Sequence, residues 1–484
     1  MFINILSILF AIYMIWAAFF IVLENRRPQA TYAWLLAFVA FPVVGLVVYY
    51  FLGRGSKAFS QESRMARDVV DGDFRKTLES QIMMPPEIID RMAAENPDTV
   101  DLKLMKLISN NVGTALTGRN KVKILQDADS FYPALLADLR EAKHHIHLQY
   151  YIWTDDDFTE ELKAVLIERA NAGVIVRALY DASSKSMLSK EYIADLQNNN
   201  VQFIPYLGYN TLRTIHLANY RCHRKITIID GRIGYLGGMN LDREQMPDVA
   251  WPHWRDTQVR VHGEAAQALQ VAFFTAWNNT KAERIDDKVV YFPDLSEEVP
   301  NLMPVQITMS GPDSQWHGIR QVFAHLINSA RDHIYIQSPF FIPDEAISEA
   351  MKSAAIAGVD VRMICTPRGA TFQIPYRAAN TYFQEMAEAG VKIYLYNGGY
   401  YHAKTVNMDS QICSIGSCNM DIRSYNLNYE INSVIYDREQ SEELAAQFHR
   451  DLEDCTEFDL EEYNSRSIWS RFIDSVYRLG SPTM

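Results

Sequence analysis

Two apolar runs open the chain. Residues 2–23 contain no charged side chain, and residues 31–52 form a second run rich in Val, Leu, Phe and Tyr. Each run has about the length that a helix needs to cross a bilayer. The first run lacks a basic start and exceeds the apolar core of a usual signal peptide, so we expect it to be retained. The pattern therefore predicts a two-span transmembrane helical hairpin over residues 1–54, in which Pro42 is tolerated as a kink or in a re-entrant form.

The basic residues beside these runs predict an orientation. The turn between the runs carries Arg26 and Arg27, whereas the stretch after the second run carries a larger basic set: Arg54, Lys57, Arg64 and Arg67. Basic residues favour the cytoplasmic side, and an even number of spans returns the chain to the side on which it began. We therefore expect the rest of the protein to be cytoplasmic.

The pattern changes after the apolar runs. Residues 55–120 are polar and mixed in charge, with one amphipathic helical pattern near Leu102 and Ile108. A solvated helical connector is the expected structure, with a lipid-facing collar as the alternative. Strand and helix patterns then alternate over residues 121–290 and again over 303–484, joined by a proline-containing segment. This alternation predicts an α/β fold of two lobes, lobe 1 and lobe 2, each with a mixed central sheet.

The two lobes repeat one another. The sequence from His145 to Gln149 matches that from His333 to Gln337, and an Ala-Gly-Val segment at 172–174 matches one at 357–359. Self-similarity over this length indicates duplication of a whole structural unit. We expect two similar lobes related by a pseudo-two-fold axis.

Each lobe carries the same polar motif. Its first copy is His223, Lys225, Asp230 and Asn240, and its second copy, with identical spacing, is His402, Lys404, Asp409 and Asn419. A histidine and a lysine two residues apart in a strand share one face. A carboxylate follows each copy, Asp256 in lobe 1 and Glu430 in lobe 2. The axis would bring both histidines into one site.

These residue types suit attack on a phosphodiester. One histidine would attack phosphorus while the other protonates the leaving oxygen and later accepts a proton from the incoming hydroxyl. The lysines and asparagines would bind the non-bridging oxygens. Asp256 and Glu430 would orient the imidazoles. Asp230 and Asp409, at the far strand ends, are expected to brace the fold or the interface between the lobes. Such a site needs no metal.

Composition narrows the choice of partners and cofactors. The formal net charge of −13 argues against nucleic acid as the main partner, although local basic residues still permit an anionic lipid surface. The five cysteines follow no metal-binding spacing, and no nucleotide-binding loop is present. We expect no cofactor, and the pattern predicts no particular oligomeric state.

The duplicated motif resembles the signature of the phospholipase D superfamily. The segments 310–313 and 340–345 and the Glu-Asn-Arg-Arg-Pro turn at 24–28 are similar to those of bacterial cardiolipin synthases. The resemblance implies a multi-pass protein of the bacterial cell membrane that converts two phosphatidylglycerols into cardiolipin and glycerol through a phosphohistidine. It assigns His223 as the nucleophile and His402 as the acid and base, with the reverse left open. The alternatives are a hydrolytic phospholipase D and a transferase that uses phosphatidylethanolamine as donor.

The C-terminal tail adds one amphipathic pattern. Ile468, Phe472, Val476 and Leu479 recur at helical spacing among arginines. Such a helix suits a membrane interface, and docking on the protein's own surface is the equal alternative.

Overall fold

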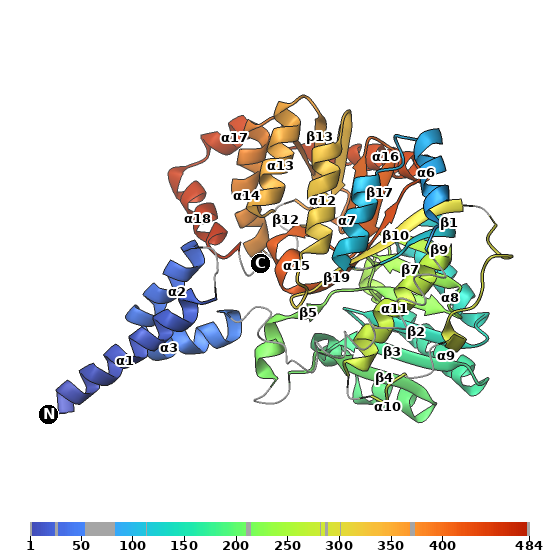
Figure 1. Cartoon of the computed structure of the whole chain (residues 1–484), viewed down its shortest axis with the longest axis horizontal. Coiled ribbons are helices and arrows are strands. Elements are labelled where there is room, and N and C mark those ends of the chain that lie inside the picture. The colour runs from blue at the N-terminus through green and yellow to red at the C-terminus, as the bar shows by residue number, and fades with distance from the viewer. Residues whose placement is uncertain are drawn as a thin grey trace. The chain divides into compact units, whose positions relative to one another are not determined.

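The structure is a computed structural model that describes residues 2–24, 28–53, 83–112, 114–209, 214–280, 282–285, 289–300, 302–367 and 373–481. The chain divides into two compact units, one of residues 1–59 with 209–219 and one of residues 60–208 with 220–484. Figure 1 labels their helices and strands. We describe each unit by itself.

The smaller unit is helical. It comprises α1 (Phe2–Val22), α2 (Pro28–Ala40), α3 (Pro42–Val48), a π-helical turn (Tyr49–Gly53) and a 3₁₀ turn (Ile215–Asn219). The second apolar run is thus broken at Phe41, because the ring of Pro42 disfavours a helical residue before it. Ala17, Ile21 and Phe38 form a small core with Tyr49. Across the part of the chain that the structure describes, we find no helix whose length and hydropathy together suffice for a membrane span. The expected turn residues Arg26 and Arg27 and the basic residues from Arg54 to Arg67 lie outside the described residues.

The larger unit is built on one sheet. Its described residues form a sheet of 16 strands in the order β20-β14-β13-β11-β16-β17-β19-β10-β1-β9-β7-β6-β2-β3-β4, with β5 paired to β19. The strands of lobe 1 are β1 (Leu116–Gln126), β2 (His145–Tyr150), β3 (Ile175–Asp181), β4 (Val201–Tyr206), β5 (Arg221–Cys222), β6 (Ile226–Ile229), β7 (Ile233–Gly237), β8 (Trp254–Arg255) and β9 (Thr257–Gly263). Those of lobe 2 are β10 (Leu302–Ser310), β11 (His333–Gln337), β12 (Phe341–Ile342), β13 (Asp360–Cys365), β14 (Lys392–Tyr396), β15 (Tyr400–Tyr401), β16 (Thr405–Met408), β17 (Ile412–Gly416), β18 (Met420–Asp421), β19 (Asn428–Ile435) and β20 (Cys455–Glu457).

The duplication is visible in the strand order. Reading outward from the centre, lobe 1 runs β1-β9-β7-β6-β2-β3-β4 and lobe 2 runs β10-β19-β17-β16-β11-β13-β14. The central strands β1 and β10 pair antiparallel, with Leu116 opposite Gln306 and Thr117 opposite Val305. Antiparallel pairing of equivalent strands is what a two-fold axis between the lobes requires. The predicted mixed α/β architecture is confirmed, and the two expected sheets are one.

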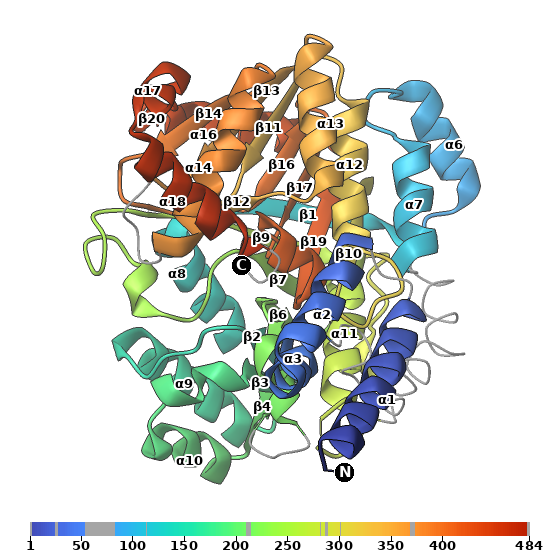
Figure 2. The ribbon, with the colours of Figure 1, turned by 90° about the vertical axis from the view of Figure 1, so that its left-hand side faces the viewer.

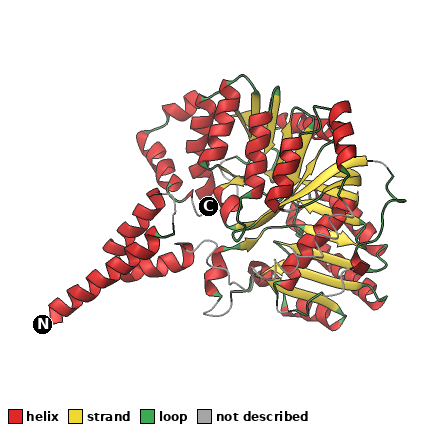
Figure 3. Cartoon of the chain, viewed as in Figure 1, coloured by secondary structure: helices red, strands yellow, loops and turns green. Residues whose placement is uncertain are grey.

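Helices cover both faces of the sheet (Figure 3). The helices are α6 (Pro86–Glu95), α7 (Leu102–Val112), α8 (Asp127–Arg140), α9 (Asp157–Asn171), α10 (Lys190–Asn198), α11 (Glu264–Asn278), α12 (Gly318–Ser329), α13 (Glu345–Ile356), α14 (Gln373–Glu388), α15 (Ile422–Asn426), α16 (Arg438–Leu452), α17 (Leu460–Ser465) and α18 (Ile468–Arg478). Strand β11 illustrates the layering. Ile334 and Ile336 join the core under α12, α13 and α14, which form a row in Figure 1. Tyr335 points the other way and stacks on Phe448 of α16 at 4.6 Å.

One sequence expectation is wrong in this unit. Helix α7 is not a solvated connector, because Leu104 and Ile108 are fully buried and Met105 nearly so, in the same core cluster as α12 of lobe 2. Its apolar stripe is therefore a packing surface. The first part of the expected connector, residues 55–82, lies outside the described residues.

Asp230 and Asp409 occupy equivalent turns. Asp230 and Gly231 take φ of 56° and 65°, and Asp409 and Ser410 take 52° and 51°, the left-handed geometry of a type I′ turn. The Asp230 carboxylate accepts the backbone N–H groups of residues 143, 144 and 145 at 2.8–2.9 Å. The Asp409 carboxylate accepts those of residues 331, 332 and 333, each at 2.9 Å. Each carboxylate thereby ties a hairpin turn to the start of another strand of its lobe, β2 for Asp230 and β11 for Asp409.

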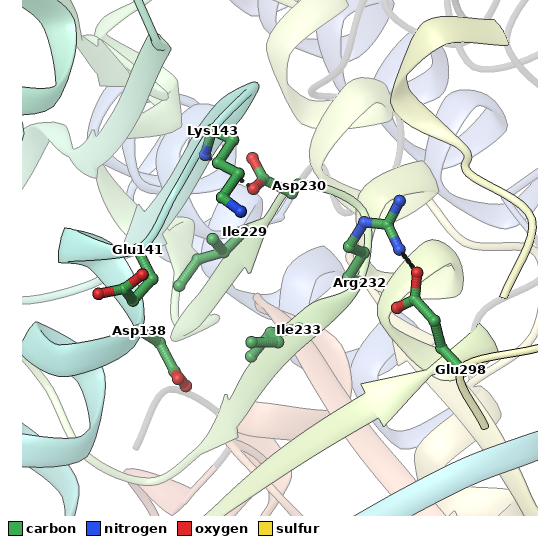
Figure 4. A pocket seen from close by; sticks show the side chains of 8 residues that line it. All are labelled: Asp138, Glu141, Lys143, Ile229, Asp230, Arg232, Ile233 and Glu298. Carbon is green, nitrogen blue, oxygen red and sulfur yellow. Dashed lines mark hydrogen bonds and ion pairs between the residues drawn. The ribbon is translucent and has the colours of Figure 1, made fainter. Parts of the chain in front are cut away.

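Asp230 also lines a surface pocket of about 380 Å³ (Figure 4). The other lining residues are Asp138, Glu141, Lys143, Ile229, Arg232, Ile233 and Glu298. The pocket lies at the turn end of β6, whereas His223 precedes the opposite end of that strand. Asp230 is therefore separated from the motif histidine by the length of β6.

We expect Asp230→Ala to lower the free energy of unfolding by about 2 kcal/mol, because three backbone donors lose a charged acceptor and alanine tolerates a positive φ poorly. Asp230→Asn should cost less, since an amide oxygen still accepts and Asn visits this region. Urea unfolding followed by circular dichroism measures both. The control is Asp98→Ala, which removes a surface ion pair to Arg331 at 3.5 Å and should cost under about 0.5 kcal/mol. Equal costs for Asp230→Ala and Asp98→Ala would contradict the bracing role.

Candidate active site

Two short strand pairs cross from one lobe to the other. Strand β5 runs parallel to β19, and the His223 N–H, one residue beyond β5, donates to the Tyr429 carbonyl at 3.0 Å. Strand β15 runs parallel to β8, and the His402 N–H donates to the Arg255 carbonyl at 2.7 Å. Each motif histidine is thus held by the backbone next to the other lobe's carboxylate.

The imidazole–carboxylate pairs are consequently crossed. Nδ1 of His223 lies 3.0 Å from Oε2 of Glu430, and Nδ1 of His402 lies 2.6 Å from Oδ2 of Asp256. A carboxylate that accepts the Nδ1 proton fixes the tautomer and leaves the Nε2 lone pair exposed to a substrate. Lobe 1 therefore orients the histidine of lobe 2, and lobe 2 orients that of lobe 1.

The two lysines lie behind the histidines. Lys225 donates through Nζ to the His223 carbonyl at 2.7 Å, and Lys404 donates in the same way to the His402 carbonyl. Burial, followed by the charge of Lys404, lowers the pKa of Lys225 to about 7. Burial lowers the pKa of Lys404 to about 8, although nearby carboxylates act in the opposite direction. The site therefore holds cations that an arriving anion would stabilise.

The same surroundings keep the imidazoles neutral and the carboxylates ionised. Burial lowers the pKa of His223 to about 4 and of His402 to about 3, against the opposing pull of their carboxylate partners. Burial acts to raise the pKa of Asp256 and of Glu430, yet the neighbouring lysines and histidines hold both below their ordinary values. Each histidine is thus a base in the substrate-free site.

The carboxylates are supported differently in the two halves. Glu430 accepts from the Ser417 hydroxyl and from the Asn428 amide, the latter at 3.1 Å. Asp256 accepts the Thr257 N–H at 2.7 Å and packs on Gly238, where an added Cβ would lie 2.0 Å from Oδ1. Gly238 and Ser417 occupy equivalent positions, so the lobe with the longer carboxylate side chain has an extra hydroxyl donor. The role of Ser417 was missed from the sequence, and its only signal was this Gly-to-Ser difference between the copies.

The motif asparagines follow β7 and β17. Asn240 is buried and its Oδ1 accepts the Ile152 N–H at 3.1 Å, which leaves the amide NH₂ group for the site. Asn419 is also buried, and its Oδ1 has no hydrogen-bond partner among the described residues. Asp230 and Asp409 are the two motif residues that are not gathered here.

Aromatic rings flank the two histidines. Trp254 lies edge-on to His402 at 5.5 Å and packs on Tyr400 at 4.5 Å. On the other side, Tyr151 lies 4.9 Å from His223 and under the Lys225 ammonium at 5.1 Å. These rings limit the water around the reacting groups.

A buried arginine holds one of the crossing strands. Arg255 is fully buried, and its guanidinium binds Asp451 at 2.8 Å and Asp127 at 3.2 Å. These two ion pairs fix the position of β8 and hence of the neighbouring Asp256. The sequence pattern pointed to the neighbouring Asp256 but not to Arg255 or its partners. The described residues form no cluster of three or more His, Cys, Asp or Glu that could hold a metal ion.

Comparison with known proteins identifies the family. The family described as "Cardiolipin synthase, PLD-like domain" matches residues 135–277 and 323–452, one match in each lobe. The chain is 36% identical to the cardiolipin synthase of Alkalihalophilus pseudofirmus over 99% of this chain and 94% of that one. The chain belongs to the cardiolipin synthase family. The cardiolipin synthase of Listeria monocytogenes is likewise 36% identical, over 99% of this chain and 98% of its own. The expected family and enzyme class are confirmed.

Two further matches concern the N-terminal region and the fold. A family described as "Phospholipase_D-nuclease N-terminal" matches residues 12–54. The crystal structure of phosphatidylserine synthase from Haemophilus influenzae superposes with a TM-score of 0.59 at 15% identity, covering 79% of this chain and all of that one. At that identity the likeness establishes the fold alone.

We expect Gly238→Ala to lower kcat by about a hundredfold, because the added methyl displaces the Asp256 carboxylate and frees the His402 ring. Phosphatidyl transfer measured with detergent-solubilised lipid tests this. Gly208→Ala is the matched control, since a Cβ there meets no atom within 4 Å. Full activity of Gly238→Ala would show that the Asp256–His402 pair is dispensable.

We expect kcat/KM to fall as the pH rises above about 7, by about tenfold per pH unit once Lys225 loses its proton and more steeply above about 8, where Lys404 also loses its proton. The lowered pKa values of Lys225 and Lys404 are the cause. At pH values between these lowered pKa values and the ordinary lysine pKa of 10.5, the unfolded chain binds more protons than the folded chain. The contribution of the two lysines to the free energy of unfolding therefore becomes more favourable to the folded state as the pH rises. Circular dichroism at each pH separates loss of charge from loss of fold, and a flat profile from pH 7 to 9.5 would contradict the assignment.

Proposed function

We propose that this enzyme transfers a phosphatidyl group from one phosphatidylglycerol to another, releasing glycerol and forming cardiolipin through a phosphohistidine. The observation that carries the proposal is the crossed arrangement of His223 with Glu430 and His402 with Asp256. Two oriented imidazoles with two buried lysines supply a nucleophile, an acid and positive charge, which a phosphodiester exchange needs.

In the first half-reaction, Nε2 of His223 attacks phosphorus of the donor lipid. The bond from phosphorus to the glycerol oxygen breaks, and protonated His402 donates its proton to that oxygen. Glycerol leaves and the phosphatidyl group stays on His223. Lys225, Lys404, Asn240 and Asn419 bind the non-bridging oxygens and stabilise the charge that develops on them.

In the second half-reaction, neutral His402 accepts a proton from the glycerol hydroxyl of the second phosphatidylglycerol. The resulting oxygen nucleophile attacks phosphorus, the phosphorus–nitrogen bond breaks, and cardiolipin forms with His223 free and His402 protonated. The energy of the first phosphodiester is conserved on the histidine, so no nucleotide donor is required.

The low pKa of the free His402 is compatible with its role as an acid. A phosphodiester anion placed between the rings adds negative charge at close range, and an opposite charge favours the protonated imidazole. Substrate binding therefore raises the pKa of His402, and the imidazole takes up a proton from the solvent. This effect is strongest where water is excluded, as beside Trp254 and Tyr400.

We further propose that residues 2–23 and 31–52 form a two-span membrane hairpin with the lobes in the cytoplasm. Support comes from the absence of charge in the first run and from the exposure of Ile12, Ile15 and Phe19 on α1, each more than half accessible. Single cysteines introduced after residue 54 should resist impermeant thiol reagents in intact cells. Labelling there from outside would reverse the orientation.

Purified protein given phosphatidylglycerol alone, labelled at the phosphate and the headgroup, should form cardiolipin and release glycerol in equal amounts. When the enzyme is denatured during turnover without acid and then digested with a protease, the labelled phosphate should be on the peptide that carries His223. His223→Ala should lower the formation of both products by at least about a thousandfold, whereas His262→Gln, on the β9 surface, should retain activity.

Other outcomes would contradict parts of the proposal. Phosphatidic acid as the sole product would make the enzyme a phospholipase, and no product would point to phosphatidylethanolamine as the donor. Label on His402 would exchange the roles of the two histidines.

A further inference from the structure

The C-terminal helix α18 faces the protein with its polar side. Asp474 is fully buried at the contact with α14, where its carboxylate binds Arg377 at 3.4 Å, Asn380 at 3.2 Å and Arg466. Arg478 pairs with Glu385 of α14. Figures 1 and 2 both show α18 beside α14. Ion pairs and hydrogen bonds thus fix the rotation of the helix about its axis.

The opposite side of α18 is apolar and exposed. Its members and their exposed fractions are Ile468 80%, Trp469 72%, Phe472 56%, Ile473 42%, Val476 46% and Leu479 80%. At 100° per residue these positions fall within one arc opposite Asp474. Lone exposed apolar residues are ordinary, but six on one helix face form a continuous patch. We call this set the α18 apolar face.

The charge around this face favours an anionic lipid surface. The segment 466–479 contains three arginines and one aspartate, and it stays basic although Arg466 pairs with Asp474 and Arg478 with Glu385, whereas the whole chain has a net charge of −13. A locally basic helix with Trp and Phe on its apolar side has the composition of helices that lie in the headgroup layer. One helix of 11 residues is about 16 Å long, so it offers less area than the roughly 800 Å² per partner of a stable protein dimer.

We propose that α18 is a membrane-docking helix whose apolar face inserts into the interfacial layer of an anionic bilayer. The polar contacts to α14 then fix the orientation of the larger unit at the membrane surface, because Asp474 and Arg478 hold α18 rigidly to the lobe. This lipid contact is separate from the phosphatidyl transfer and from the N-terminal hairpin. The larger unit thus has a lipid contact of its own.

Lipid-borne quenchers test the contact in the full chain. A fluorophore is placed at Phe472→Cys in a Cys455→Ser background, since the other four cysteines are buried. The protein is reconstituted singly into nanodiscs of phosphatidylglycerol that carries bromine on its acyl chains. The control label is at Ile356→Cys on α13, a lone apolar residue that is 75% exposed. Quenching at 472 should exceed that at 356 by about threefold or more.

Equal quenching at the two positions would overturn the proposal. A label at 472 that is shielded from water but unquenched would also overturn it, because a protein surface would then cover the face. The quenching readout needs no turnover, so its result stands whether or not the proposed reaction is correct.

Activity gives a second readout. Replacing Phe472, Val476 and Leu479 together with serine should lower the rate of phosphatidyl transfer on phosphatidylglycerol bilayers by about tenfold. The rate in detergent micelles should stay within about twofold of that of the unmodified enzyme. These side chains are exposed, so the fold should persist. Equal loss in both assays would mean that the face acts through protein structure and would refute the docking role. An unmodified enzyme that forms no cardiolipin on bilayers or in micelles would instead contradict the proposed function.

Discussion

Charge balance in a buried site is the constraint on which this structure depends. Lys225 and Lys404 carry two positive charges, and Asp256 and Glu430 carry two negative ones, all nearly or fully removed from water. Buried charges persist only when opposite charges and hydrogen bonds offset the loss of hydration. With neutral histidines the four charges sum to zero. An incoming phosphodiester adds one negative charge, which protonation of one imidazole neutralises.

This balance can be reached only by joining the lobes. Neither lobe places its own carboxylate on its own histidine, since β5 pairs with β19 and β15 pairs with β8. The continuous sheet through β1 and β10 sets the two halves at the required spacing. Duplication therefore supplies both partners, and the interface makes each half incomplete without the other. The small departures from symmetry, Asp against Glu and Gly238 against Ser417, give the two histidines different surroundings from equivalent backbones.

Two amphipathic helices of similar appearance in the sequence are used in opposite ways. Helix α7 packs its apolar stripe into the core of lobe 2, whereas α18 packs its polar side on α14 and leaves its apolar face outward. Amphipathicity fixes only that the two sides of a helix differ. Which side faces the protein follows from whether the opposing surface is an apolar groove, as beside α12, or a set of charged partners such as Arg377.

The sequence by itself determined the duplicated α/β fold, the family and the ten candidate site residues, because strand periodicity, repeat spacing and the His-x-Lys pattern are local properties of the chain. It also indicated that Asp230 and Asp409 lie at strand ends, away from the histidines. Only the tertiary structure decided that the imidazole–carboxylate pairs cross between lobes, that the two sheets merge, that Arg255 finds Asp451 and that Ser417 supports Glu430. Those contacts join residues up to about two hundred positions apart, and their geometry arises from how the lobes pack, which no local pattern encodes.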